Sequence, residues 1–305
     1  MTRASPAVPP WSLAVAAMLL IQLGVALSVG LVASVGSAGT AWLRLTAGAV
    51  ILLVVVRPQL REVRRQDLPA LLGLGVTVGV VTTCFLAAIA RIPLGTAVAI
   101  EFLGPLTVAA IRSHSRRALA WPALALVGVV LLTEPWRGGV NLLGVGFAGL
   151  AAVGWAAYIL LTQRVGDRFG GITGLALTIP VAALTAAVVG IPQAAGHLTV
   201  EVVAVAAAIA LLHPVVPFAL EMLALRRMTT AAFGTLMAVE PAIGLVLGLV
   251  VLRQTPSLVQ VLGILLVVLA GAAAQRGGRR VQPEEADVKL QVDLNQDAGR
   301  DREDG

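Results

Sequence analysis

The segment LGTAVAIE at residues 94–101 has a near copy, FGTLMAVE, at residues 233–240. Four of the eight positions are identical, at an offset of 139 residues: Gly95/Gly234, Thr96/Thr235, Ala99/Ala238 and Glu101/Glu240. Each copy ends on a glutamate inside an apolar run. The prolines that follow differ in register, because Pro105 stands four residues after Glu101 whereas Pro241 directly follows Glu240. The pair predicts a structural unit that occurs twice.

The sequence around both copies is too apolar for a water-soluble globule. Of the 305 residues, 58% are hydrophobic and only 12% are charged, against roughly 25% charged in soluble domains. A helix crosses a bilayer core of about 30 Å with roughly 20 apolar residues, whereas a barrel strand is shorter and alternating. The polar interruptions delimit ten such helices, at residues 11–35, 39–56, 68–90, 94–111, 119–134, 140–163, 171–190, 200–224, 230–252 and 256–275.

The fourth and ninth of these helices carry the two copies, so the repeated unit has five helices. An odd number of helices makes the second unit enter the membrane from the opposite face. We therefore expect an all-α polytopic membrane protein whose ten transmembrane helices form two inverted-topology five-helix repeats. The expected divisions are a cytoplasmic N-terminus at 1–10, the first repeat at 11–134, the second at 135–275 and a disordered cytoplasmic tail at 276–305.

Arginines are distributed unevenly between the two sets of loops. One side holds fifteen: Arg3, Arg57, Arg61, Arg64, Arg65, Arg112, Arg116, Arg117, Arg164, Arg168, Arg226, Arg227, Arg276, Arg279 and Arg280. The other side holds three: Arg91, Arg137 and Arg253. Because cytoplasmic loops carry an excess of Lys and Arg, both termini are expected in the cytoplasm. The net charge of +6 thus reflects topology, and no nucleic-acid partner is expected.

Short loops leave the chemistry to the helices themselves. The single cysteine, Cys84, excludes a disulfide framework or a thiolate cluster, and no phosphate loop, HExxH or GxSxG motif occurs. We expect a secondary transporter, with no enzymatic activity, metal or cofactor, whose partners are the lipid bilayer and a small-molecule substrate. An intramembrane enzyme and a non-transporting membrane partner or sensor are the alternative classes. The sequence leaves monomer or homodimer undecided.

Six segments carry a family resemblance across the membrane region. They are IQLG at 21–24, AWLRL at 41–45, PLGTAVAIEFLGPL at 93–106, GWAAYILLTQR at 154–164, PFALEMLAL at 217–225 and FGTLMAVEP at 233–241. The chain resembles EamA-type transporters of the drug/metabolite transporter superfamily, and among them the bacterial inner-membrane threonine/homoserine exporters. The resemblance implies an inner-membrane location, alternating access, and export of small amino acids or related metabolites coupled to proton entry. A different small metabolite or drug stays open, because four residues depart from the family pattern: Thr82, Thr83, Cys84 and His213.

Ionisable groups inside the expected helices are few. A charge at the centre of a span costs about 2.5 to 3.5 kcal/mol, so such a group faces a cavity or a partner. Glu101 is the candidate for proton coupling, because a carboxyl there can load a proton from one side and release it to the other. The alternative is a structural glutamate, either protonated or paired with an arginine. Gly104 and Pro105 follow within about one turn, and broken helices mark binding sites in transporters.

Glu240 is the counterpart of Glu101 in the second unit. Either it binds a substrate ammonium or it pairs with Arg44, the only arginine well inside a span. Pro241 lacks an amide and frees a backbone carbonyl one turn back. Glu221 lies closer to the cytoplasmic end, near the arginines at 226–227. Its alternatives are an ion pair that acts as a gate latch and a contact with substrate.

Further polar and aromatic groups are candidates for the substrate site. His213 precedes Pro214, and Pro217 follows one turn later, so the eighth helix is expected to kink. The imidazole either lines the cavity or satisfies the backbone that the prolines free. Four more residues either contact substrate or hold helices together: Gln22, Thr82, Trp155 and Tyr158.

Overall fold

The computed structural model describes residues 9–59, 61, 63–112, 116–137, 139–169, 171–225, 233 and 236–276. Within these ranges every regular element is a helix and there is no strand. The main helices are α1 (Pro10–Val56), α2 (Leu68–Ile89), α3 (Leu94–Glu101), α4 (Leu103–Arg112), α5 (Ala120–Thr133), α6 (Leu142–Phe169), α7 (Gly171–Ala194), α8 (Val200–Ala210), the π-helical η5 (Leu211–Val215), α9 (Val216–Leu225), α11 (Glu240–Val250) and α12 (Leu258–Arg276). Residues 1–8 of the predicted N-terminus (1–10) and 277–305 of the predicted tail (276–305) lie outside the described residues, as do the arginines at 226–227.

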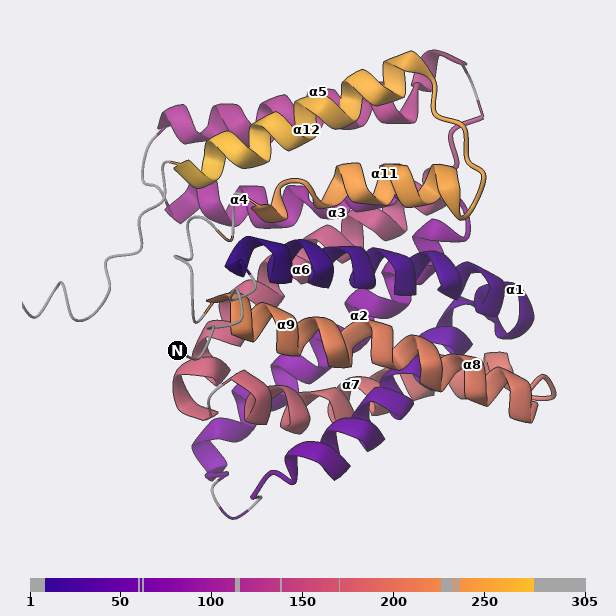
Figure 1. Cartoon of the computed structure of the whole chain (residues 1–305), viewed down its shortest axis with the longest axis vertical. Coiled ribbons are helices and arrows are strands. Elements are labelled where there is room, and N and C mark those ends of the chain that lie inside the picture. The colour runs from indigo at the N-terminus through magenta and orange to yellow at the C-terminus, as the bar shows by residue number, and fades with distance from the viewer. Residues whose placement is uncertain are drawn as a thin grey trace, which may run out of the picture.

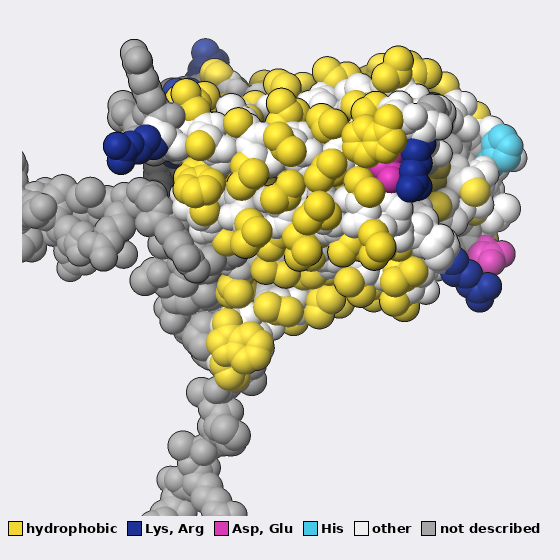
Figure 2. Space-filling model, turned by 90° about the horizontal axis from the view of Figure 1, so that it is seen from above, with side chains coloured by type: hydrophobic (Ala, Val, Ile, Leu, Met, Phe, Trp, Pro, Cys, Tyr) yellow, Lys and Arg dark blue, Asp and Glu magenta, His cyan; other side chains and the backbone are white. Residues whose placement is uncertain are grey.

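The surface identifies a multi-pass membrane protein. Five of the described helical segments are long and apolar enough to cross a bilayer: Trp11–Val56, Arg65–Ile89, Leu94–Arg112, Leu142–Gly166 and Ile172–Ala194. Large apolar side chains stand exposed along the helices, among them Val188, Leu142 and Leu258. Figure 2 shows hydrophobic side chains covering the flank of the helical body, while charged side chains gather mainly toward its two ends. An apolar helical flank suits contact with lipid, because helices satisfy their backbone hydrogen bonds internally.

Helix α1 consists of two helical segments. Its 47 residues cover both of the first two predicted spans, and Gly36 between them has a positive φ of 75°. Glycine adopts this backbone conformation without steric cost. Beyond the bend, the amides of Ala38 and Gly39 donate to the Gln193 Oε1 at 2.7 and 3.1 Å. Gln193 of α7 thus caps the start of the second segment, which would otherwise have unpaired amides.

Packing joins the two halves of the chain throughout. Helix α1 packs most extensively on α7, and α2 packs on both α6 and α7. Helices α5 and α12 lie side by side along one edge, with α3, α4 and α11 next to them (Figure 1). Gly75 and Gly79 of α2 lie directly against Val181 and Ala182 of α7, so these glycines serve packing inside the monomer.

Two helices are interrupted next to a glutamate. Helix α3 ends at Glu101, Phe102 forms a turn, and α4 then begins at Leu103. In the second half a turn at residues 238–239 precedes α11, which begins at Glu240. Each turn starts three residues before a proline, Pro105 or Pro241. Because proline cannot donate to the carbonyl four residues earlier, the breaks follow the prolines. The two glutamates consequently lie on opposite sides of their breaks.

A third interruption separates α8 from α9. Residues 211–215 form a π-helical segment in which His213 has extended backbone angles, φ −163° and ψ 112°. Pro214 follows it directly. Gly24 of α1 lies against this segment, and a Cβ placed there would lie 3.2 Å from the His213 Cβ. The absence of a side chain at residue 24 therefore lets His213 approach α1 closely.

Candidate functional site: a polar cavity among apolar helices

A cavity of about 240 Å³ lies where the interrupted helices meet α1, α2, α6 and α7. Most of its wall is apolar, but it includes four of the nine polar or charged residues that are buried in the described part of the chain. It is lined by Ile21, Gln22, Val25, Arg44, Val78, Val81, Thr82, Phe85, Leu86, Glu101, Trp155, Tyr158, Leu175, Ile179, His213, Pro214, Pro217, Glu221, Met237 and Glu240. A small pocket with few polar groups in an apolar wall is the usual form of a small-molecule site.

Eleven residues singled out from the sequence meet in this cavity. They are Gln22, Arg44, Thr82, Glu101, Trp155, Tyr158, His213, Pro214, Pro217, Glu221 and Glu240. Three others do not line it. Pro105 and Pro241 stand at the helix breaks, and Gly104 lies against the backbone of Ala152 in α6. Those three residues shape the helices that present the glutamates.

Three carboxyl groups gather at one part of the cavity. The Gln22 Nε2 donates a hydrogen bond of 3.1 Å to the Glu240 Oε1. Glu101 and Glu221 each lie close enough to Glu240 to interact with it electrostatically. Glu240 and Glu101 are only 4% and 8% exposed. Three acids so close together in a buried site attract a cation or protons.

Arg44 and His213 form the other polar part of the cavity, here called the Arg44–His213 pair. The Arg44 side chain, 4% exposed, donates from one terminal nitrogen to the Ser28 Oγ at 2.8 Å. Ser28 in turn donates to the Gly24 carbonyl at 2.6 Å. Gly24 touches His213, so the guanidinium and the imidazole share one region of α1. One predicted alternative was an ion pair between Arg44 and Glu240. The ion pairs found among the described residues do not include it.

Unpartnered polar atoms concentrate in this cavity. Among the described residues, five buried side-chain atoms have no hydrogen-bond partner, and four of them belong to residues that line it. These four are the Gln22 Oε1, the Arg44 Nε, the His213 Nδ1 and the Glu240 Oε2. Leaving a buried polar group unpaired costs about 1 to 3 kcal/mol, and more for a charged one. The site therefore favours an occupant that offers both hydrogen-bond donors and acceptors.

The apolar wall was missed by the sequence reasoning. Trp155 and Tyr158 were among the predicted candidates for the substrate site, but Phe85 and Met237 were not. Each of these two stands three residues from a predicted site residue, Thr82 or Glu240, and three residues is the spacing of one helical face. Ser28 was also missed. The sequence signal for Ser28 is indirect: a buried Arg44 requires a hydrogen-bond partner, and Ser28 is that partner.

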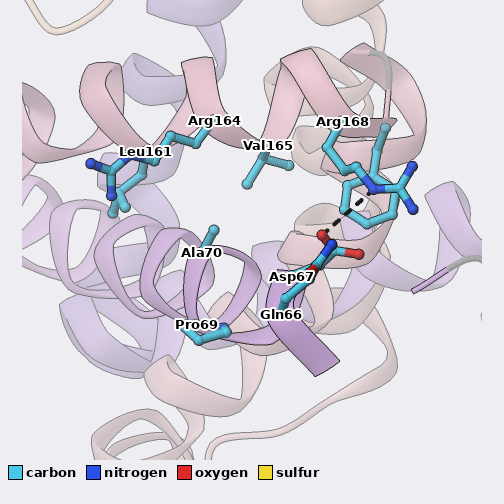
Figure 3. A pocket seen from close by; sticks show the side chains of 9 residues that line it. Gln66, Asp67, Pro69, Ala70, Leu161, Arg164, Val165 and Arg168 are labelled. Atoms are coloured by element: carbon cyan, nitrogen blue, oxygen red, sulfur yellow. Dashed lines mark ion pairs between the residues drawn. The ribbon is translucent and has the colours of Figure 1, made fainter. Parts of the chain in front are cut away.

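A second cavity, of about 370 Å³, lies between the start of α2 and the end of α6 (Figure 3). Asp67 and Arg168 point toward each other there, with the Arg168 Nε 3.5 Å from the Asp67 Oδ1. The lining includes exposed side chains such as Gln66 and Arg164. It contains none of the unpartnered buried atoms, so it lacks the feature that marks the first cavity as a ligand site.

Comparison with known proteins agrees with this architecture. The model of the EamA-like transporter family matches residues 142–273. The threonine/homoserine exporters RhtA of Salmonella typhimurium (strain LT2) and Escherichia coli (strain K12) are each 36% identical to this chain over 297 residues. The alignments cover 94% and 96% of this chain, and 99% and 98% of those proteins.

The fold is also found in a solved structure. That crystal structure superposes on 89% of this chain and on 99% of its own, with a TM-score of 0.59 at 19% sequence identity. The likeness concerns the fold alone. Taken with relatives that are 36% identical along almost the whole length, the EamA match shows that this chain belongs to the EamA-like transporter family, as an EamA-type drug/metabolite transporter.

Proposed function

We propose that this chain exports small amino acids of the threonine and homoserine kind across the inner membrane, by proton antiport with alternating access. One observation carries the proposal: one cavity among lipid-exposed helices is lined by residues with both donor and acceptor atoms that are buried and unpartnered. A zwitterion supplies both kinds of partner. The relatives named threonine/homoserine exporters support the substrate class.

Glu240 is the group that receives the substrate ammonium in this proposal. Its Oε1 is held by Gln22, and its Oε2 has no partner and borders the cavity. Trp155 and Tyr158 line the same cavity and offer ring faces, which attract a cation. Thr82 offers a hydroxyl group that suits a hydroxylated side chain such as that of homoserine. Glu221 adds a further acid nearby.

Glu101 is the group that carries the proton. Its carboxyl borders the cavity and makes no hydrogen bond to any residue that the structure describes. A buried carboxyl close to another acid, here Glu240, exchanges a proton readily, because two neighbouring negative charges repel each other. Loading from outside and release to the cytoplasm would couple proton entry to export of the amino acid.

The proposed architecture is ten transmembrane helices in two inverted repeats, residues 11–134 and 135–275. Helix α1 supplies two spans, α3 with α4 supplies one, and α8 with α9 supplies one. Exchanging the two repeats converts the packing of α1 on α8 into the packing of α6 on α2, and both packings occur. The pairs α3 with α11 and α5 with α12 would be exchanged with themselves, and both are in contact.

Both termini are proposed to lie in the cytoplasm, flanking the repeats as segments 1–10 and 276–305. Reporter fusions test this orientation. Fusions after Arg65, Arg117, Arg168 and Arg227 should report cytoplasm, because these loops carry the excess of arginine. Fusions after Arg91, Gly139 and Arg253 should report the outer side. A cytoplasmic signal at Gly139 would contradict the division into five plus five helices.

Flux in proteoliposomes tests the function. Purified protein is reconstituted into proteoliposomes, which are loaded with labelled L-homoserine or L-threonine. A pH gradient is then imposed, with the medium outside the vesicles more acidic than the lumen. The proposal predicts uphill movement of the amino acid against the proton flow, abolished by a protonophore. Failure with these two amino acids but flux with another metabolite or drug would keep the transporter and change the substrate. No flux for any member of a broad panel would favour a non-transporting membrane protein.

A further inference from the structure

Arg44 has no acidic partner among the residues that the structure describes. It is nevertheless 4% exposed, inside the membrane region, and lines the cavity. A buried charge without a counter-charge is strongly unfavourable unless a ligand or hydrogen bonds compensate it. Its bond to the Ser28 hydroxyl provides part of that compensation and leaves the Nε without any partner.

The Ser28 bond fixes where the guanidinium points. Ser28 is anchored by its own bond to the Gly24 carbonyl one turn earlier, so the hydroxyl oxygen is directed toward Arg44. Gln22, on the same segment of α1, instead directs its amide to Glu240. Ser28 and Gln22 are six residues apart, which is about 9 Å along the helix axis. Through Gln22 and Ser28, this segment of α1 therefore fixes a carboxyl, that of Glu240, and a guanidinium, that of Arg44, beside the same cavity.

We propose that Arg44 binds the carboxylate of the exported amino acid, and that Ser28 positions the guanidinium for this contact. A planar guanidinium with free N–H groups matches a carboxylate better than an ammonium does. Arg44 then makes the carboxylate a requirement: compounds that keep the ammonium and hydroxyl but lack the negative charge are rejected. This assignment rests on the proposed function and adds to it the part of the substrate that is selected.

Competition on the unmodified protein gives the first test. Uptake of labelled L-threonine into proteoliposomes is competed with unlabelled L-threonine, with L-threoninamide, in which the carboxylate is a neutral amide, and with 1-amino-2-propanol, which lacks it. The two analogues should need concentrations about tenfold or more above that of L-threonine for equal inhibition, because a charge-assisted hydrogen bond is lost. Equal competition by L-threoninamide would overturn the proposal. This arm requires no variant to fold.

Substitution gives the second test. Arg44→Gln should raise the half-saturating concentration of L-threonine by about tenfold or more while leaving inhibition by 1-amino-2-propanol unchanged. The preference for the carboxylate should therefore collapse toward one. Arg44→Lys should keep part of the preference, since it retains the charge without the fork. Arg91→Gln removes an exposed arginine that lies two residues beyond the end of α2 and outside the cavity, and it should leave both constants unchanged.

The possible outcomes separate the two proposals. If the unmodified protein moves L-threonine and Arg44→Gln keeps the full preference for it over 1-amino-2-propanol, Arg44 is structural and only the present assignment fails. If Arg44→Gln weakens L-threonine and 1-amino-2-propanol equally, the assignment fails as well, because a general loss of the site would act on both. If the unmodified protein moves neither L-threonine nor L-homoserine, the proposed function fails and takes this assignment with it.

Discussion

The two interrupted helices place their glutamates in different electrostatic settings. Glu101 is the last residue of α3, whereas Glu240 is the first residue of α11. The N-terminal end of a helix favours a negative charge and the C-terminal end disfavours it. One motif, with its proline moved by three positions, thus gives Glu240 the setting that tolerates a negative charge better than the setting of Glu101 does.

Their hydrogen bonds differ in the same sense. Glu240 accepts from Gln22 at 3.1 Å, while the Glu101 carboxyl makes no hydrogen bond to a described residue. A donated hydrogen bond favours the charged form of a carboxylate. The unequal surroundings support a division of labour in which Glu240 receives the ammonium and Glu101 carries the proton. A near-repeat in sequence therefore need not mean equal roles.

Substitution of Glu240 should have the strongest effect. Glu240→Gln removes the charge proposed to face the ammonium. The affinity for substrate should therefore fall by on the order of a hundredfold in both uphill export and substrate exchange. Half-saturating concentrations of L-homoserine in proteoliposomes measure this. Glu201→Gln changes an exposed glutamate at the start of α8 and serves as the matched control. Unchanged exchange in Glu240→Gln would remove Glu240 from the substrate site.

The next largest effects are expected from substituting the two prolines, which should distinguish the role of Glu101 from that of Glu240. Pro105→Ala restores an amide that can bond the Glu101 carbonyl, so the helix can close and move the Glu101 side chain. Uphill export should fall about tenfold through this misplacement, while substrate exchange changes less. Pro241→Ala should reduce both modes, because it moves Glu240. Thermal unfolding of both variants checks that the loss is not a loss of fold. If the two variants lost uphill export and substrate exchange in the same proportion, this would argue against separate roles for Glu101 and Glu240.

The bend at Gly36 provides the smallest expected change. Gln193→Ala leaves the amides of Ala38 and Gly39 without their acceptor, which should cost about 1 kcal/mol of stability, as for a lost helix cap. Unfolding midpoints in detergent measure this loss of stability. The control is Gln66→Ala, which changes an exposed glutamine just before α2. Affinity for L-homoserine should stay within about twofold, because the bend lies outside the cavity. A large loss of affinity would mean that this bend belongs to the site.

The sequence predicted the residues of the cavity better than their partners. Glu101, Glu240 and Gln22 stand out because a polar group inside an apolar helix has to be compensated, and all three line the cavity. That Arg44 bonds Ser28 rather than Glu240 depends on how the two segments of α1 fold back at Gly36, which sequence spacing does not encode. Phe85 gave no signal either, because an aromatic residue in an apolar span is ordinary.

The sequence predicted where the helices are interrupted, but not how the glutamates lie relative to the interruptions. Gly36 lies between the first two predicted spans, and the structure breaks α1 there into two helical segments, the second of which is capped by Gln193. The glutamates could not be placed relative to their breaks, since the identical residues and the prolines suggest different registers. The structure follows the prolines, because a missing amide acts on the backbone directly.

Proton coupling through Glu101 is tested most directly by one measurement on Glu101→Gln, an almost isosteric change that removes titration. The variant and the unmodified protein are reconstituted in parallel, and uphill flux of L-homoserine under an imposed pH gradient is compared with its exchange at equal pH. We expect exchange to stay within about twofold, because it needs no net proton movement, and uphill flux to disappear. In the unmodified protein, alkaline medium on the outer side should weaken export. If Glu101→Gln still concentrates L-homoserine as well as the unmodified protein does, Glu101 is structural and the proton takes another route.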